Sequence, residues 1–134
     1  MFMNIFRVLC YVKFLLGGTK VTFWSFRQEE SAPIMKKPSS ARNHTGHITC
    51  LCVSRDGTLA ATGGTDCLVN IWQLNSHELQ CTMDGHLSSV TTVSLAANGL
   101  FAVSGSEDHT ARVWGLTLGL VVSVFRVSTS KSAI

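Results

Sequence analysis

A serine, a histidine and an aspartate in the second half of this 134-residue chain have the residue types of a hydrolytic triad. In such a triad, His86 would take the proton of the Ser104 hydroxyl while Asp108 orients the imidazole, which makes the serine a nucleophile. The same order of residue types occurs 42 positions earlier, with Thr62 in place of the serine, and a tryptophan follows both sets. Two copies with different hydroxyls and a shared tryptophan favour a repeated structural feature. We therefore expect no enzymatic activity and no catalytic residue.

A second group of residues has the side chains of a zinc site. His44, His47, Cys50 and Cys52 lie within nine residues, and imidazole and thiolate are good zinc ligands. Their spacing is not that of a zinc finger. Because His44 also belongs to the repeated set, at most three uncommitted ligands remain. We expect no bound metal and no cofactor.

Composition bears on several further classes of function. The formal net charge is only +3, and lysine and arginine do not gather in one segment, so we expect no nucleic-acid binding. The apolar run over residues 1–16 is interrupted by Arg7 and Lys13, which favours buried strands over a membrane anchor. No glycine-rich phosphate loop with a following lysine is present, and we expect no small-molecule substrate.

The cysteines indicate a reducing compartment. Their number is odd, and no convincing secretion signal precedes them, which predicts free, buried thiols. The five cysteines are Cys10, Cys50, Cys52, Cys67 and Cys81.

The elements that must position the repeated groups form a tandem repeat. Residues 43–74 align with residues 85–116 without a gap, and the identities concentrate in glycine, histidine, aspartate and tryptophan. Asp56-Gly57 and Asn98-Gly99 favour tight hairpins between short strands. The predicted strands are 48–54, 59–62, 68–73 and 78–83 in the first unit, and 90–95, 101–104, 110–115 and 120–125 in the second. Apolar residues occupy both parities of these strands, which predicts sheets covered on both faces.

A sequence that repeats every 42 residues, with four strands per unit, resembles the WD-repeat (WD40) β-propeller family. The second unit reads GHLSSVTTVSLAANGLFAVSGSEDHTARVW, with the Gly-His opening, the Ser-Gly-Ser-x-Asp turn and the closing tryptophan. The first unit departs at its opening, where Asn43-His44 replaces Gly-His. Gln73 and Gly115 stand where the family has an aspartate after the tryptophan. The resemblance implies an all-β fold, a partial β-propeller of four-stranded antiparallel blades.

In this family a histidine, a hydroxyl of the second strand, the turn aspartate and the tryptophan form a buried hydrogen-bonded network. The resemblance implies that role for eight residues of this chain. They are His44, Thr62, Asp66 and Trp72 in the first unit, and His86, Ser104, Asp108 and Trp114 in the second. An imidazole can donate to a carboxylate and accept a hydroxyl proton, and a buried indole N–H needs an acceptor, so the groups satisfy one another.

The resemblance also implies that turns on one rim of the blades contact other proteins. Four side chains are expected to be exposed there and to serve as contacts. They are His47, Arg55, His109 and Arg112.

The repeat divides the chain into four parts. Residues 1–42 are predicted to be a degraded N-terminal blade and linker, since Val21–Phe26 resembles Val69–Leu74. Residues 43–84 and 85–125 are the two WD repeats. Residues 126–134 are predicted to be a short tail, because Val127-Ser128 stands where the next Gly-His would fall.

This count of blades predicts a truncated piece of a longer propeller protein. A closed propeller has about four to eight blades, so two good blades and a degraded one leave sheet faces without neighbours. We expect those faces to be apolar, with Leu95, Phe101, Val113 and Val124 among their residues.

The function implied by the resemblance is a protein–protein interaction scaffold or adaptor in the cytoplasm or nucleus. A blade has no chemistry of its own and holds loops on a rigid support. The alternative is an accessory propeller segment of a multidomain signalling ATPase of the NACHT-and-WD-repeat kind. The expected partners are other proteins or the missing blades, with no nucleic acid and no membrane.

Overall fold

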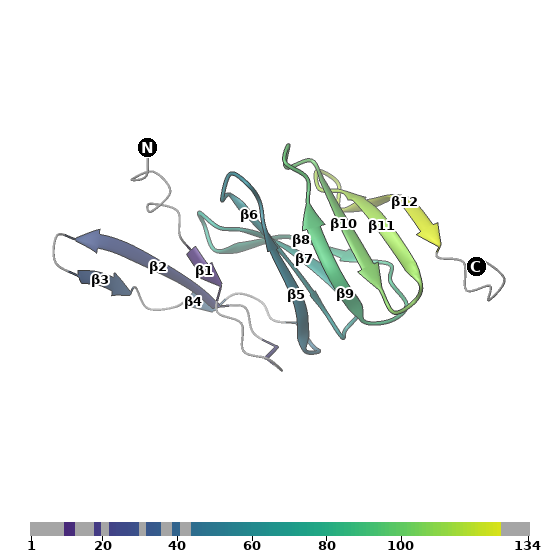
Figure 1. The fold of residues 1–134 in the computed structure, drawn as a ribbon, viewed down its shortest axis with the longest axis horizontal. Coiled ribbons are helices and arrows are strands. Elements are labelled where there is room, and N and C mark those ends of the chain that lie inside the picture. The colour runs from purple at the N-terminus through teal and green to yellow at the C-terminus, as the bar shows by residue number, and fades with distance from the viewer. Residues whose placement is uncertain are drawn as a thin grey trace, which may run out of the picture.

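The computed structural model describes residues 10–12, 18–19, 22–29, 32–35, 39–40 and 44–126. Every regular element within these residues is a β-strand, so the all-β prediction is confirmed. In Figure 1 three antiparallel sheets follow one another in chain order from left to right. The predicted tail over residues 126–134 lies outside the described residues except for Arg126, which is the last residue of a strand.

Two four-stranded sheets correspond to the two predicted blades. The first has the order β5 (Ile48–Val53), β6 (Leu59–Gly64), β7 (Leu68–Gln73) and β8 (Glu78–Asp84). The second has the order β9 (Val90–Leu95), β10 (Phe101–Ser106), β11 (Thr110–Gly115) and β12 (Leu120–Arg126). Each sheet is a meander, so strands that are consecutive in the sequence are hydrogen-bonded neighbours.

The N-terminal region forms a third antiparallel sheet around one long strand. Its strands are β1 (Cys10–Val12), β2 (Thr22–Glu29), β3 (Ala32–Met35) and β4 (Ser39–Ser40). Phe23 pairs with Val12 of β1 and also with Ser39 of β4, so these two strands flank β2 on opposite sides. The strand predicted from the likeness of Val21–Phe26 to Val69–Leu74 is therefore present and extends to Glu29.

The second strand of each blade is longer than the sequence predicted. The predicted strand 59–62 continues through Gly63 and Gly64, which pair with Cys50 and Ile48 of β5. A Cβ atom at Gly63 would lie 2.5 Å from Val90 Cγ1, so the missing side chain lets the next sheet approach. In the same way, β10 runs to Ser106.

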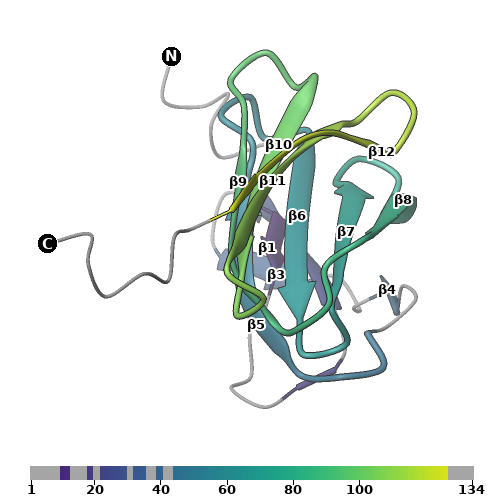
Figure 2. The ribbon, with the colours of Figure 1, turned by 90° about the vertical axis from the view of Figure 1, so that its right-hand side faces the viewer.

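The main core lies between the two blades, where β5 and β6 pack against β9. Figure 2 shows the second sheet stacked in front of the first. The buried residues of this core are Leu59, Ala61, Val69, Ile71 and Met83 from the first blade and Val90, Val93, Ala102, Trp114 and Leu116 from its C-terminal neighbour. A smaller cluster of Ile48, Ala60, Trp72 and Leu74 lies on the opposite face of the first sheet.

Candidate functional site

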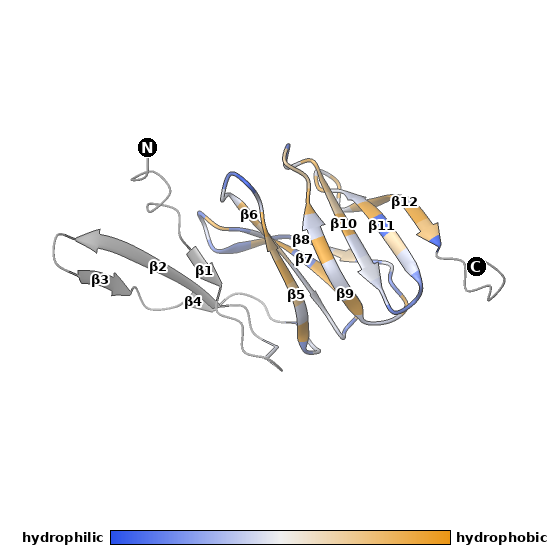
Figure 3. Ribbon diagram, viewed as in Figure 1, coloured by the Kyte–Doolittle hydropathy of each residue, from blue (hydrophilic) through white to orange (hydrophobic). Residues whose placement is uncertain are grey.

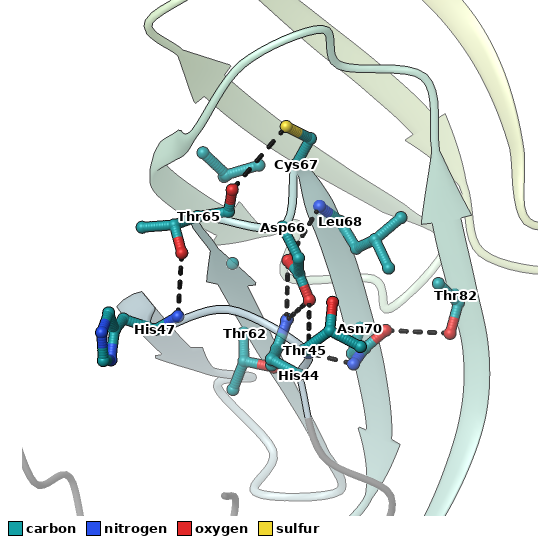
Figure 4. A network of polar contacts seen from close by, with 12 residues as sticks. His44, Thr45, His47, Thr62, Thr65, Asp66, Cys67, Leu68, Asn70 and Thr82 are labelled. Atoms are coloured by element: carbon teal, nitrogen blue, oxygen red, sulfur yellow. Dashed lines mark hydrogen bonds and ion pairs between the residues drawn. The ribbon is translucent and has the colours of Figure 1, made fainter. Parts of the chain in front are cut away.

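Four of the predicted side chains meet at one end of the first blade. His44 precedes β5, Thr62 lies on β6, Asp66 lies in the turn after β6, and Trp72 lies on β7. The Nδ1 atom of His44 is 2.9 Å from Asp66 Oδ2, and its Nε2 atom is 2.7 Å from the Thr62 hydroxyl. The Trp72 indole N–H donates to that same hydroxyl oxygen at 2.9 Å. Figure 4 shows the histidine and aspartate facing each other across the end of the sheet.

The second blade repeats this arrangement with a serine. The Nδ1 atom of His86 is 2.9 Å from Asp108 Oδ2, and its Nε2 atom is 2.6 Å from Ser104 Oγ. The Trp114 indole N–H donates to Ser104 Oγ at 2.8 Å, and the indole packs edge-on against the imidazole. The structure thus brings together the four side chains of each predicted set.

The hydrogen bonds of each set form a chain with a direction. The hydroxyl oxygen accepts the indole N–H, so its own proton is available for the histidine Nε2 atom. The Nδ1–H group of the histidine then donates to the carboxylate. Every donor is used in this order, which is the condition under which a buried polar cluster stabilises a fold.

The aspartates also hold the backbone of two separate segments. Asp66 Oδ2 accepts the amide of Thr45 at 3.1 Å, and Asp66 Oδ1 accepts the amide of Leu68 at 3.1 Å. Asp108 accepts the corresponding amides of Leu87 at 3.0 Å and Thr110 at 2.9 Å. Each carboxylate therefore ties the segment before the first strand to the turn before the third.

The environment of Asp108 favours its charged form. Burial by itself raises the pKa of this carboxyl group. Hydrogen bonds from the Thr110 hydroxyl, the Leu87 amide, the His86 imidazole and the Thr110 amide outweigh burial and hold the pKa well below its ordinary value. Asp108 therefore stays a carboxylate throughout the neutral range.

The structure adds residues to both networks that the sequence analysis missed. Asn70 Nδ2 lies 3.4 Å from His44 Nε2, and Asn70 Oδ1 accepts the Thr82 hydroxyl at 2.8 Å. In the second blade the Thr110 hydroxyl donates to Asp108 Oδ1 at 2.5 Å. Asn70 stands between a valine and an isoleucine in a predicted buried strand, and this pattern was a usable signal for its place in the first network. The Asp-x-Thr spacing of a side-chain turn was a usable signal for the second.

The surroundings of Ser104 differ from those of a nucleophilic serine. Its side chain has no exposed surface, and its oxygen already accepts the indole N–H of Trp114. A substrate carbonyl has no path to this oxygen in the folded blade. The geometry that resembles a triad therefore serves to satisfy buried polar groups.

The residues with zinc-ligand side chains, from which no metal site was expected, are not gathered around one point. His44 is committed to Asp66 and Thr62, whereas Cys50 and Cys52 pack against the core between the blades. Burial raises the pKa of the Cys50 thiol, which disfavours the thiolate that a metal needs. Among the described residues no group of three histidine, cysteine or acidic side chains is placed to hold a metal ion. The four described cysteines outside the N-terminal sheet are free thiols, as the sequence predicted, but each is only partly buried.

The four predicted contact residues are not equally accessible. His47, Arg55 and His109 are exposed, and the amide of His47 donates to the Thr65 hydroxyl at 2.8 Å. Arg112 is only partly exposed, contrary to the expectation. Its Nε atom is buried, and a Cβ atom at Gly85 would lie 2.8 Å from its Nη1 atom. The reason is its place on β11, on the side of the sheet that faces the first blade.

The opposite face of the second sheet is open. Phe101 is 39% exposed, whereas Leu59 at the equivalent position of the first blade is 7% exposed. Phe125 is 60% exposed, whereas its equivalent Met83 is fully buried. Leu95, which was expected on an open face, instead packs against the core between the blades, because its parity on β9 is that of Val93.

No helix in the described part of the chain is long and apolar enough to cross a membrane. This result applies only to the residue ranges given above.

Comparison with known proteins identifies one family model in this chain. The model described as WD domain, G-beta repeat matches residues 37–73 and 77–115. Each match ends with the third strand of a blade, at Gln73 of β7 and Gly115 of β11.

Three curated relatives show the range of similarity. The chain is 30% identical over 89 residues to eukaryotic translation initiation factor 3 subunit I of Candida glabrata, which covers 66% of this chain and 26% of that protein. It is 36% identical over 86 residues to Protein tipD of Dictyostelium discoideum, covering 61% of this chain and 14% of the relative. It is 28% identical over 133 residues to Mitochondrial division protein 1 of Candida glabrata, covering 92% of this chain and 17% of the relative. The chain thus spans about a quarter or less of the length of these relatives.

Proposed function

Because the chain belongs to the WD-repeat family, we propose that it works as a protein–protein interaction scaffold or adaptor. Repeats of this kind generally mediate contacts between proteins. In this chain the open face of the second blade is the main contact surface, and the exposed residues His47, Arg55 and His109 provide further contacts.

The observation that carries the proposal is the difference between equivalent faces of the two blades. In the first blade, Ala61 is buried against the next sheet, and the Thr49 hydroxyl donates to the carbonyl of Val90 in that sheet. In the second blade, Val103 and Thr91 stand at the equivalent positions and are exposed. A face that is built for a neighbouring sheet and has none among the described residues favours an interaction with another protein.

We further propose that the open face of the second blade is covered by further propeller blades, either from a longer form of the same protein or from a partner chain. The short share of each relative that this chain spans supports the first of these sources. Two longer forms fit this proposal, a scaffold alone and a multidomain signalling ATPase of the NACHT-and-WD-repeat kind. Of these we propose the scaffold, in the cytoplasm or nucleus.

Affinity capture from cells with two matched variants tests the contact surface. Val103→Lys places a charge on the open face, whereas Leu118→Lys places the same charge in an exposed turn. We expect the proteins captured by the wild-type chain to be lost with Val103→Lys and retained with Leu118→Lys. Equal capture by all three forms would contradict the proposal.

Extending the transcript in both directions tests whether a longer form of the protein supplies the further blades. Further blades without another domain would support the scaffold. An upstream phosphate-binding loop would instead support the ATPase.

A further inference from the structure

The outer strand of the second blade has an unusual exposed surface. β12 has a hydrogen-bonded neighbour, β11, on one side only, within the part of the chain that the structure describes. Five of its side chains are apolar and exposed, and three of them, Leu120 at 62%, Val122 at 59% and Val124 at 42%, differ in polarity from their equivalents in the first blade. Figure 3 shows this strand coloured as hydrophobic along most of its length.

The equivalent strand of the first blade has polar side chains at the same three positions. Glu78, Gln80 and Thr82 of β8 stand where β12 has its leucine and two valines, and all three are exposed. The two strands share their length and the irregularity in pairing beside the tryptophan. The blade itself therefore does not require apolar residues there. Polar residues on an edge strand normally prevent pairing with other chains, and β12 has none at these three positions.

We propose that β12 is a strand-addition surface through which two copies of this chain pair edge to edge in an antiparallel dimer. The two outer strands would become the central strands of a continuous sheet formed from both second blades. The free N–H and C=O groups of each edge would be paired, and the apolar side chains would pack across the two-fold axis.

The charges on the strand favour a second copy as the occupant. When two β12 strands pair along their full length, Leu120 lies opposite Arg126 of the other copy, and the residues between them carry no charge. When two β8 strands pair in the same way, Glu78 lies opposite Asp84, and like charges at opposite positions are unfavourable. Self-pairing is thus open to β12 and opposed for β8.

This surface is distinct from the open face used in the proposed function. The open face is covered when another sheet stacks on the blade, whereas the outer edge stays accessible in such a stack. The edge can therefore dimerise whether or not further blades are present.

The test measures the dissociation constant of the dimer by sedimentation of the full chain. The triple variant Leu120→Lys, Val122→Gln, Val124→Thr puts polar residues at three exposed positions of β12, so folding should be retained, and it places a like charge opposite Arg126 of the other copy. We expect the dissociation constant to increase by about tenfold or more in this variant. The control Val103→Lys changes the open face, and we expect it to leave the edge-paired dimer intact.

Hydrogen exchange identifies the surface independently of the size measurement. We expect the amides of residues 120–126 to exchange more slowly as the wild-type concentration rises, and those of residues 78–84 to exchange at an unchanged rate. A monomeric wild-type chain at all attainable concentrations would overturn the proposal. So would a dimer that survives the triple variant, and a dimer that is lost only with Val103→Lys would assign self-association to the open face.

Discussion

Each buried hydroxyl of the two networks performs two tasks, because it accepts from an indole and donates to an imidazole. Ser104→Ala removes both interactions and leaves two buried groups without partners. We expect this variant to lower the free energy of unfolding by about 1 to 3 kcal/mol, since an unsatisfied buried group costs that much. Ser94→Ala on the exposed side of β9 is the matched control and should have little effect. Chemical denaturation of both variants measures the difference, and equal midpoints would show that the hydroxyl contributes no stability.

The lowered pKa of Asp108 makes part of the stability depend on pH. A carboxyl group whose pKa is lower in the folded state stabilises the fold above the pKa of the unfolded chain, about 4. That contribution is lost as the pH falls through the folded-state value. We therefore expect Asp108→Asn to be less stable than wild type at neutral pH, with the difference shrinking below about pH 4. Denaturation at a series of pH values measures this, and a difference that stays constant down to acid pH would contradict the assignment.

At the scale of the element, the turns carry local strain that a substitution can relieve. His109 in the turn between β10 and β11 has a φ of 64°, a left-handed conformation that glycine adopts more readily. Cys67 at the equivalent position of the first blade has a φ of 70°. We expect His109→Gly to raise the free energy of unfolding by about 0.5 kcal/mol, the net of relieved strain and added chain entropy. His109→Ala keeps the strain and should not stabilise the chain, which thermal unfolding of both variants would show.

The elements also show how far the sequence could be interpreted. The strand positions followed from the offset of 42 and the Asp-Gly and Asn-Gly turns, because a hairpin turn fixes where its strands begin and end. Gly63 and Gly64 were misassigned because a glycine pair reads as a turn, and only the close approach of Val90 explains a strand there. Arg112 was expected to be exposed because it was counted among the contacts on the rim of the blades. The side of the sheet that it occupies depends on packing between blades, which the local sequence does not specify.

At the scale of the whole molecule, the two blades are alike in backbone and unlike in burial. Met83→Thr and Phe125→Thr change equivalent positions of the repeat, one fully buried and one 60% exposed. We expect the first to lower the free energy of unfolding by about 2 to 4 kcal/mol, because it leaves a cavity and buries a hydroxyl. The second should change the stability little and reduce the binding of a hydrophobic dye to the folded chain. Denaturation and dye fluorescence measure the two effects, and a comparable loss of stability in both variants would mean that the second face is covered.

The hydrogen bonds by which each aspartate joins two segments of its own blade affect the order of folding. Asp66 and Asp108 each bond a backbone amide 21 residues away, whereas the Thr49 hydroxyl and the Val90 carbonyl that link the two blades are 41 residues apart. Short loops close with less loss of chain entropy than long ones, so contacts within a blade form ahead of contacts between blades. Each repeat can then acquire its own topology as it leaves the ribosome, and the docking of one blade on the next becomes the late, slower step. Until that step, both apolar faces of the first blade are open to chaperones.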